Sequence, residues 1–505
     1  MSTSLDALTS LASTVLQPGF EGTTPPAWVR RWLGEGLGGV VLFARNVDSP
    51  EQVAALTTAL RAERPDLLIA IDEEAGDVTR FESRLGSSRP GNLALGAIDD
   101  PELTEEVARD LGVELAEAGI NLNYAPDADV NSNADNPVIG VRSFGADPEL
   151  VARHTAAWIR GLQATGIAAC AKHFPGHGDT NVDSHADVPY IGATWEQLVA
   201  CELAPFRAAI AAGVQAVMTG HLLVPALDPR RPATLSRRIL TGLLRDELGF
   251  QGVVITDGIE MRAVTHRYGF EAAAVHALAA GADAICVGGE HSDEGSARRL
   301  RDAIVAAVVE GTLPEERLAE AAKRIEQLAA WTIQAGSTRP KWTGADQNGS
   351  AIGTAAARRA VRVTVSPQHD GVLPLTGPAH VVEFAPPTNI AMGAETPWGV
   401  GAPLATLLPG TTTVRIGVED LPPDVEPSAA LVADARHRPL VLVVRDLHRH
   451  DWMAAAVSRA LAARPDAVVV ELGVPARVVG DVHLATYGAT RASGWAAASI
   501  LAGRP

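Results

Sequence analysis

The sequence has few of the features that mark disulfide-bonded or membrane-spanning proteins. Only three of its 505 residues are cysteines, and none forms a CxxC pair. This pattern argues against a disulfide framework and a structural zinc site. No apolar run approaches the roughly 20 residues of a membrane-spanning helix. The N-terminus lacks the basic and apolar regions of a signal peptide, so we expect a protein of the reducing cytoplasm.

Positive charge is also scarce. Lysine and arginine together number 42 against 60 acidic residues, giving a net charge of -18 that repels nucleic acid and anionic membranes. We therefore expect a small neutral or polar substrate, and no nucleic-acid or membrane partner. Lysine occurs only at Lys172, Lys323 and Lys341, while arginine is abundant. Lys172 is of interest because a site that needs only positive charge would be arginine here. No sequence feature predicts an oligomeric state.

The chain is too long for one compact core, which predicts two domains. Over about the first 330 residues, short apolar runs alternate with helical stretches, as in parallel strands that are covered on both faces. Eight such runs predict a (β/α)8 TIM-type barrel, with a doubly wound sheet as the alternative. The expected strands are 15–17, 39–43, 67–72, 120–125, 168–173, 216–219, 253–256 and 283–287. The expected helices include 50–64, 103–118, 148–165, 198–212 and 272–280.

A change in composition marks the end of the first domain. Residues 336–350 are rich in Gly, Pro, Ser, Thr and Asn and have no apolar period, which predicts a linker. Residues 1–335 then form the barrel domain, and 351–505 form a second, smaller α/β domain. Its expected strands are 380–384, 412–416, 440–444 and 468–472.

Charged residues follow three of the expected barrel strands. Asp72 ends the third strand, Lys172 and His173 end the fifth, and Asp257 follows the seventh. Buried charges cost free energy unless they are paired or used, and any one of these can be a strand-end ion pair. In a barrel, however, the carboxyl ends of the strands meet at one face. Their coincidence at three strands therefore predicts an active site.

The segment KHFPGHGDTNVDSHADVP, residues 172–189, is the densest in titratable groups. Asp183 stands two residues before His185, so a turn lets the carboxylate bond to the imidazole. Such a pair fixes the histidine tautomer and raises the basicity of the other ring nitrogen. The pattern favours a general acid/base in a glycine-containing loop, and the alternative is a solvated polar loop.

A metal site is the second alternative for this segment. His173, His177, Asp179 and His185 all have ligand chemistry, but neither HxH nor HExxH spacing is present. We therefore expect no metal. We also expect no other cofactor, because the GxGxxG match at Gly34–Gly39 precedes a strand instead of following one. The DLHRHD run at 446–451 reads as a solvated loop of the second domain.

Four motifs carry a resemblance to a known family. They are DEEAGDVTRF from Asp72, NLNYAPDADVNSNADNPVIGVRSFG from Asn121, KHFPGHGDTNVDSH from Lys172 and ITDGIEM from Ile255. Over roughly the first 335 residues the chain resembles bacterial β-N-acetylglucosaminidases of glycoside hydrolase family 3. The closing segment ATYGATRASGWAAASILAG looks like the end of that family's α/β sandwich domain.

The resemblance implies a role for each matching residue. Asp257 matches the nucleophile, and His185 matches the acid/base, with Asp183 as its partner. The implied reaction is a double displacement that releases terminal β-linked N-acetylglucosamine through a glycosyl-Asp intermediate. The implied substrate-binding residues are Asp72, Arg80, Arg142, Lys172 and His173.

The first motif departs from the family pattern. Glu73 stands where Gln is common, Ala75 replaces a Gly, and Asp77 replaces an Arg. Glu73 and Asp77 predict a more acidic rim on the leaving-group side. A His base is neutral when it accepts a proton, so phosphate can compete with water, although Asp77 counts against a strong phosphate site.

Several readings therefore stay open. Within the family they are a β-N-acetylglucosaminide phosphorylase and a β-glucosidase-type enzyme, although the family's glucosidases usually take a Glu acid/base from elsewhere. From other classes they are a barrel metallohydrolase and a non-catalytic sugar-binding protein.

Overall fold

The computed structural model describes residues 4–181, 188–337, 349–387, 391–393, 396–420, 435 and 437–504. The chain divides into two compact units. The first comprises Met1–Glu74, Pro101–Ile139 and Gly145–Gly344, and the second comprises Ala75–Asp100, Gly140–Phe144 and Ala345–Pro505. Two segments from the first half of the chain thus belong to the second unit. The proposed domain limits 1–335 and 351–505, with the linker 336–350, stay predictions.

The described part of the first unit contains eight parallel strands, and every residue in them is buried. Strands β2 to β7 pair in sequence order, and β8 pairs with β1. A parallel bridge between Ile255 and Ala284 joins β7 to the segment that enters β8. The TIM-type barrel predicted from the apolar runs is confirmed. The strands are β1 (Leu16–Pro18), β2 (Gly39–Leu42), β3 (Leu68–Ile71), β4 (Leu122–Asn123), β5 (Ala168–Phe174), β6 (Ala216–Thr219), β7 (Val253–Thr256) and β8 (Ile285–Val287).

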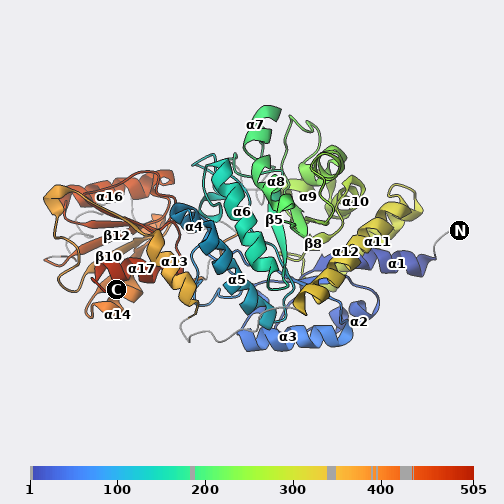
Figure 1. Ribbon diagram of the computed structural model, residues 1–505, viewed down its shortest axis with the longest axis horizontal. Coiled ribbons are helices and arrows are strands. Elements are labelled where there is room, and N and C mark those ends of the chain that lie inside the picture. The colour runs from blue at the N-terminus through green and yellow to red at the C-terminus, as the bar shows by residue number, and fades with distance from the viewer. Residues whose placement is uncertain are drawn as a thin grey trace. The chain divides into compact units, whose positions relative to one another are not determined.

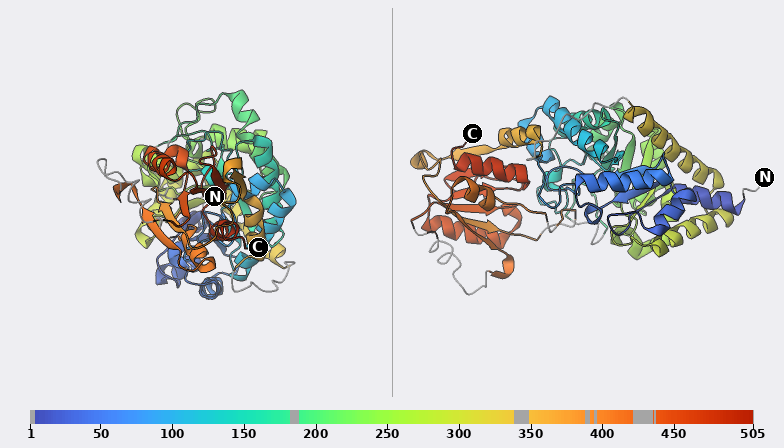
Figure 2. Two further views of the ribbon diagram at one scale, coloured as in Figure 1. Left: turned by 90° about the vertical axis from the view of Figure 1, so that its left-hand side faces the viewer. Right: turned by 90° about the horizontal axis from the view of Figure 1, so that it is seen from below.

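Helices cover these strands, as Figure 1 and the two further views in Figure 2 show. Side chains of Ser49 and Asp147 cap α3 and α6, and each cap is followed by a proline, whose missing N–H costs nothing at this position. None of the helices in the described ranges is long and apolar enough to cross a membrane. The helices are α1 (Leu5–Thr14), α2 (Ala27–Gly34), α3 (Pro50–Glu63), α5 (Pro101–Glu117), α6 (Pro148–Gln163), α7 (Trp195–Ala200), α8 (Leu203–Ala211), η4 (Arg238–Glu247), α9 (Arg262–Tyr268), α10 (Phe270–Ala280), α11 (Glu294–Val309) and α12 (Glu315–Gly336).

The single helix expected over 198–212 is wrong, because α7 ends at Ala200 and α8 begins at Leu203. Pro205 explains the break. A proline ring clashes with the carbonyl four residues earlier, which here belongs to Cys201. The break turns the side chain of Glu202 into the interior, where the residue is 2% exposed.

The second unit is built on a mixed sheet with the strand order β11-β10-β12-β13-β14-β9. Five of these strands are parallel, and β9 runs antiparallel to β14. The strands are β9 (Arg362–Val365), β10 (His380–Phe384), β11 (Thr412–Ile416), β12 (Leu440–Val444), β13 (Val468–Glu471) and β14 (Val482–Ala485). The sequence predicted β10 to β13 but missed β9, an exposed edge strand, and β14, whose apolar run is broken by His483.

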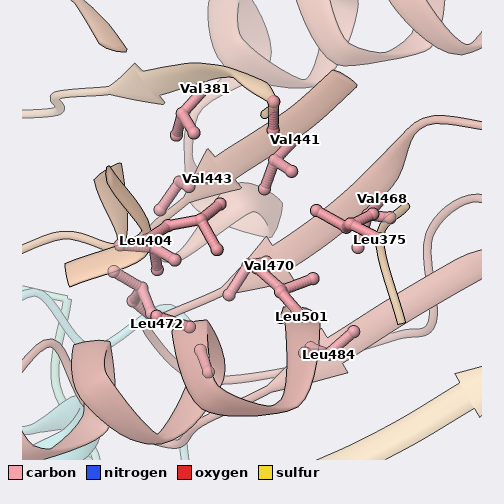
Figure 3. Close-up of a cluster of buried hydrophobic side chains, with 14 of the residues drawn as sticks. Leu375, Val381, Leu404, Val441, Val443, Val468, Val470, Leu472, Leu484 and Leu501 are labelled. Carbon is pink, nitrogen blue, oxygen red and sulfur yellow. The ribbon is translucent and has the colours of Figure 1, made fainter. Parts of the chain in front are cut away.

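Helices lie on both faces of this sheet (Figure 1). Alternate residues of the strands pack against them in two separate clusters. Val381, Val441 and Val470 pack with α14 (Gly401–Leu407) and α17 (Arg491–Leu501), and Figure 3 shows this cluster. Val382 and Leu442 pack with α16 (Asp451–Ala463) on the other face. The expected α/β sandwich is therefore confirmed.

A buried ion-pair cluster lies just before the start of β8. Asp283 is fully buried and accepts bonds from Arg245 of η4 and from Arg317 and Arg324 of α12. It also accepts a bond from the backbone N–H of Val254, at 3.0 Å. One carboxylate thus joins β7, η4 and α12.

We expect Asp283→Asn to lower the free energy of unfolding by about 3–5 kcal/mol, because breaking a buried ion pair leaves uncompensated charge. Urea unfolding at neutral pH measures the change in the free energy of unfolding. The matched control is Asp302→Asn, whose side chain is 60% exposed and whose ion pair should contribute less than about 1 kcal/mol. Equal effects of the two substitutions would contradict the role given to Asp283.

Candidate active site

Three of the sequence-predicted residues converge at the carboxyl ends of the barrel strands. Asp72 follows β3, Lys172 lies near the end of β5, and Asp257 follows β7. Burial raises the pKa of the thiols of Cys170 on β5 and Cys286 on β8, and the carboxylates of Asp72 and Asp257 raise both further. Because β3, β5 and β7 run parallel in one barrel, the residues that follow their carboxyl ends, Asp72 and Asp257 among them, lie at the same end of the barrel.

The ammonium group of Lys172 is buried between two carboxylates. Its side chain is 2% exposed and forms ion pairs with Asp72 and, at 2.6 Å, with Oε1 of Glu74. A compact ammonium with three donors can serve two carboxylates in a space where a planar guanidinium needs more room. This explains why lysine persists here in an arginine-rich chain. Glu74 was missing from the predicted site, although it lies in the same motif as Asp72.

His173 is held by Asp129, which the sequence analysis also missed. The Nδ1 atom of His173 lies 2.7 Å from Oδ2 of Asp129, and Oδ1 accepts the backbone N–H of His177 at 2.7 Å. Since a carboxylate only accepts, Nδ1 of His173 carries the hydrogen that it shares with Asp129. Burial acts to raise the pKa of Asp129. The charges and hydrogen bonds of His173 and His177 outweigh burial, so the pKa lies below its usual value. The only sequence signal for Asp129 was its place in the second motif.

Within the described residues, one buried group has the chemistry of a metal site. Ligand atoms of Asp127, Asp129 and His173 lie within 4.8 Å of one another. The bonds from His173 and His177 already occupy both oxygens of Asp129. The expected absence of a metal stays a prediction, which chelation can test.

The loop after β7 fixes the orientation of Asp257. The backbone N–H of Asp257 donates to the carbonyl of Thr219 at 3.1 Å, and that of Ile259 donates to Cys286 at 3.0 Å. The N–H of Gly258 donates to Oδ1 of Asp257 itself at 2.8 Å. The first two bonds attach the loop to β6 and β8. The bond from Gly258 sets the plane of the Asp257 carboxylate.

The geometry of the first unit does not test four of the predicted residues. Arg80 and Arg142 belong to segments of the second unit. Arg80 donates to the carbonyl of Ala391 at 2.9 Å, and Arg142 is 6% exposed. Asp183 and His185 lie outside the described residues. The roles given to all four stay predictions.

The acidic rim expected from Glu73 and Asp77 is wrong. Glu73 is 1% exposed, and the side chain of Asp77 is 3% exposed. Asp77 forms an ion pair with Arg445 at 2.7 Å and accepts the N–H of Ala489 at 2.8 Å. Burial raises the pKa of Asp77, and Arg445 opposes the rise. Arg445, the partner of Asp77, lies 368 residues further along the chain. Motif spacing could not predict a pair so distant in sequence.

Glu202 supports the segment that follows β5. It is 2% exposed, and a Cβ atom at Gly176 would lie 2.5 Å from its Oε2. Burial, together with the nearby carboxylates of Asp129 and Asp179, raises its pKa to about 8. Glu202 therefore packs in its protonated form near neutral pH, and Gly176 leaves the room for it.

The chain resembles characterised proteins over most of its length. The model for the glycosyl hydrolase family 3 N terminal domain matches residues 26–328. Beta-hexosaminidase A of Pseudoalteromonas piscicida is 34% identical over 72% of this chain, and the match spans 65% of that protein, just under two thirds. Beta-hexosaminidase of Stenotrophomonas maltophilia (strain R551-3) is 42% identical over 53% of this chain and 82% of that protein.

A solved structure matches both units. The glycoside hydrolase family 3 beta-N-acetylglucosaminidase from Paenibacillus sp. str. FPU-7 superposes with a TM-score of 0.86 at 36% identity, covering 98% of this chain and 97% of that one. The present chain therefore belongs to glycoside hydrolase family 3, and it is a glycoside hydrolase.

The raised pKa of Glu202 predicts how stability depends on pH. The folded protein keeps this proton up to about pH 8, whereas the unfolded chain loses it near 4.5. Glu202 therefore stabilises the fold fully below the unfolded pKa, and its contribution falls by up to about 1.4 kcal/mol per pH unit as pH rises through this window.

We expect Glu202→Gln to remove this decline. Unfolding free energies measured from pH 5 to 8 should show the variant gaining stability relative to the wild type as pH rises. The control is Glu326→Gln, at an exposed position of α12. A constant difference between Glu202→Gln and the wild type across the range would contradict the buried proton.

Proposed function

We propose that this enzyme is a retaining exo-glycosidase that releases terminal β-linked N-acetylglucosamine by double displacement. The observation that carries the proposal is the convergence of Asp257 with the Lys172–Asp72 ion pair at one end of the barrel. The names of the similar proteins from Pseudoalteromonas, Stenotrophomonas and Paenibacillus support the choice of sugar.

In the first step, Asp257 attacks the anomeric carbon and His185 gives a proton to the leaving oxygen. An ester to Asp257 forms as the glycosidic bond breaks. The N–H of Gly258 holds Oδ1 of Asp257, which sets the orientation of attack.

In the second step, water attacks the same carbon while His185 takes its proton, and the ester breaks. Retaining enzymes usually use two carboxyl groups for these roles. The proposed Asp183–His185 pair replaces one of them and can titrate nearer neutral pH. Because Asp257 is a separate nucleophile, the acetamido group of the substrate does not need to attack.

The sugar hydroxyls require fixed hydrogen-bonding partners. Asp72 and His173 supply a carboxylate and an imidazole, each held by an oppositely charged or polar neighbour. Such second contacts lock a side chain in the orientation that binding needs. Lys172, Arg80 and Arg142 complete the proposed set of substrate-binding residues.

Phosphate as the acceptor is the second candidate function. A deprotonated His185 is neutral, which removes a repulsion of about 4 kcal/mol per unit charge at roughly 4 Å. Two grounds against phosphate came from the sequence, namely Asp77 in place of the usual Arg and an acidic rim. Asp77 is buried and paired with Arg445, which removes the second ground, while the first remains. Hydrolysis with competition from phosphate is therefore the proposed activity.

A location in a reducing compartment belongs to the same proposal. Cys170, Cys201 and Cys286 are all free thiols, and two of them are buried. Burial raises the pKa of Cys170 and Cys286, which keeps these thiols protonated and unreactive.

We expect Asp257→Asn to fold normally and to lose nearly all turnover, because an amide cannot form the ester intermediate. Asp257→Ala with added azide should give an α-glycosyl azide, since the small anion attacks from the face that Asp257 vacates. The control is Asp246→Asn at an exposed position of η4. An Asp257→Asn variant that keeps more than about a tenth of the rate, ~1.4 kcal/mol of barrier, would refute the assignment.

We expect aryl β-N-acetylglucosaminide to exceed aryl β-glucoside by more than about tenfold in kcat/KM. The assays are run with and without phosphate at fixed pH and ionic strength, and NMR identifies the products. Free N-acetylglucosamine supports hydrolysis, whereas N-acetylglucosamine 1-phosphate as the main product makes the enzyme a phosphorylase.

A preference for glucoside favours the β-glucosidase type. Loss of activity in chelator favours a metallohydrolase, and an inert protein that binds the sugar favours a sugar-binding role.

A further inference from the structure

A fully buried histidine contacts the residue that follows Asp257. His221 lies just after β6 and has no exposed surface. Its Nε2 is 3.0 Å from the carbonyl oxygen of Gly258, and its Nδ1 is 2.8 Å from Oγ1 of Thr234. Thr234 lies in η3 (Ala233–Leu235) and is also fully buried. One imidazole thus joins three segments at the carboxyl end of the barrel.

The acceptors around His221 define where its hydrogens lie. A carbonyl oxygen only accepts, so Nε2 carries a hydrogen. In the neutral ring, the hydroxyl of Thr234 donates to Nδ1. In the imidazolium, Nδ1 donates to Thr234, whose own hydrogen goes to the carbonyl of Gly220, 3.0 Å away. The bond to Gly258 exists in both states.

Three consecutive residues of the nucleophile loop are held from outside. The N–H groups of Asp257 and Ile259 bond to backbone carbonyls of neighbouring strands. The carbonyl of Gly258, between them, is held by the side chain of His221. The peptide between Gly258 and Ile259 is therefore held at both polar groups, by Cys286 at its N–H and by the side chain of His221 at its carbonyl.

We propose that His221 is a positioning residue for the nucleophile. It holds the carbonyl of Gly258, the residue whose own N–H orients the Asp257 carboxylate. It acts through Gly258 and does not touch the substrate. The inference rests on the proposed function, in which Asp257 attacks the anomeric carbon.

Two substitutions separate this role from simple packing. Gln places an amide N–H near the position of Nε2, whereas Asn places it near Nδ1. We expect His221→Asn to lower kcat for release of the aryl group by about 10- to 100-fold, because a displaced nucleophile reacts slowly, with KM within about threefold of wild type. His221→Gln should stay within about threefold of the wild-type kcat.

Thr234 provides a variant of lower risk to folding. Thr234→Val removes the hydrogen bond that fixes Nδ1, so the ring is held from one side only and can turn away from Gly258. We expect about a three- to tenfold loss of kcat, while Thr234→Ser stays near wild type. The ¹⁵N spectrum of labelled histidine should show hydrogen on Nε2 of His221 in the wild type, and the Nδ1 resonance should shift in Thr234→Val because this nitrogen loses its donor.

The outcomes are distinct. Equal kcat losses in His221→Asn and His221→Gln, or no loss and no spectral change in Thr234→Val, would overturn the positioning role. If Asp257→Asn stays active, the proposed nucleophile itself fails. If Asp257→Asn is inactive while both His221 variants and Thr234→Val keep full kcat, only this inference fails.

Discussion

The site depends on the burial of a single ammonium group between two carboxylates. Lys172 is 2% exposed and pairs with Asp72 and Glu74. Removing charges from water is expensive, and only close pairing offsets that cost. The loop after β3 must therefore keep both carboxylates near β5. In the proposed function, substrate hydroxyls meet groups that are already oriented and need little rearrangement.

The remaining groups follow the same pattern of one side chain held by another. Asp129 holds His173, Glu202 fills the space beside Gly176, and His221 bonds to the loop of Asp257. The contacts made by Asp129 and His221 join the ends of different strands. The barrel supplies the circle of strand ends, while these buried polar contacts fix the distances within it.

Much of this arrangement could be predicted from the sequence, because parallel strands that are buried on both faces are short continuous apolar runs. The limits of β6, β7, β10, β11 and β12 were predicted as the structure has them. Strand-end charges located Asp72, Lys172 and Asp257. Residues whose role depends on distant partners were missed. Glu202 and His221 carry no local signal, and Asp129 has only its place in the second motif. The pairing of Asp77 with Arg445 contradicted the acidic rim that this residue predicted.

The membership of residues 75–100 and 140–144 in the second unit also limits how the protein can be divided. Val78 and Val141 pack with Met392, so part of the second core comes from inside the barrel sequence. A gene cut at the apparent linker would leave these apolar side chains exposed on the first fragment. The two units are therefore not separable modules, and loss of the second half in evolution would require the barrel segments to change with it.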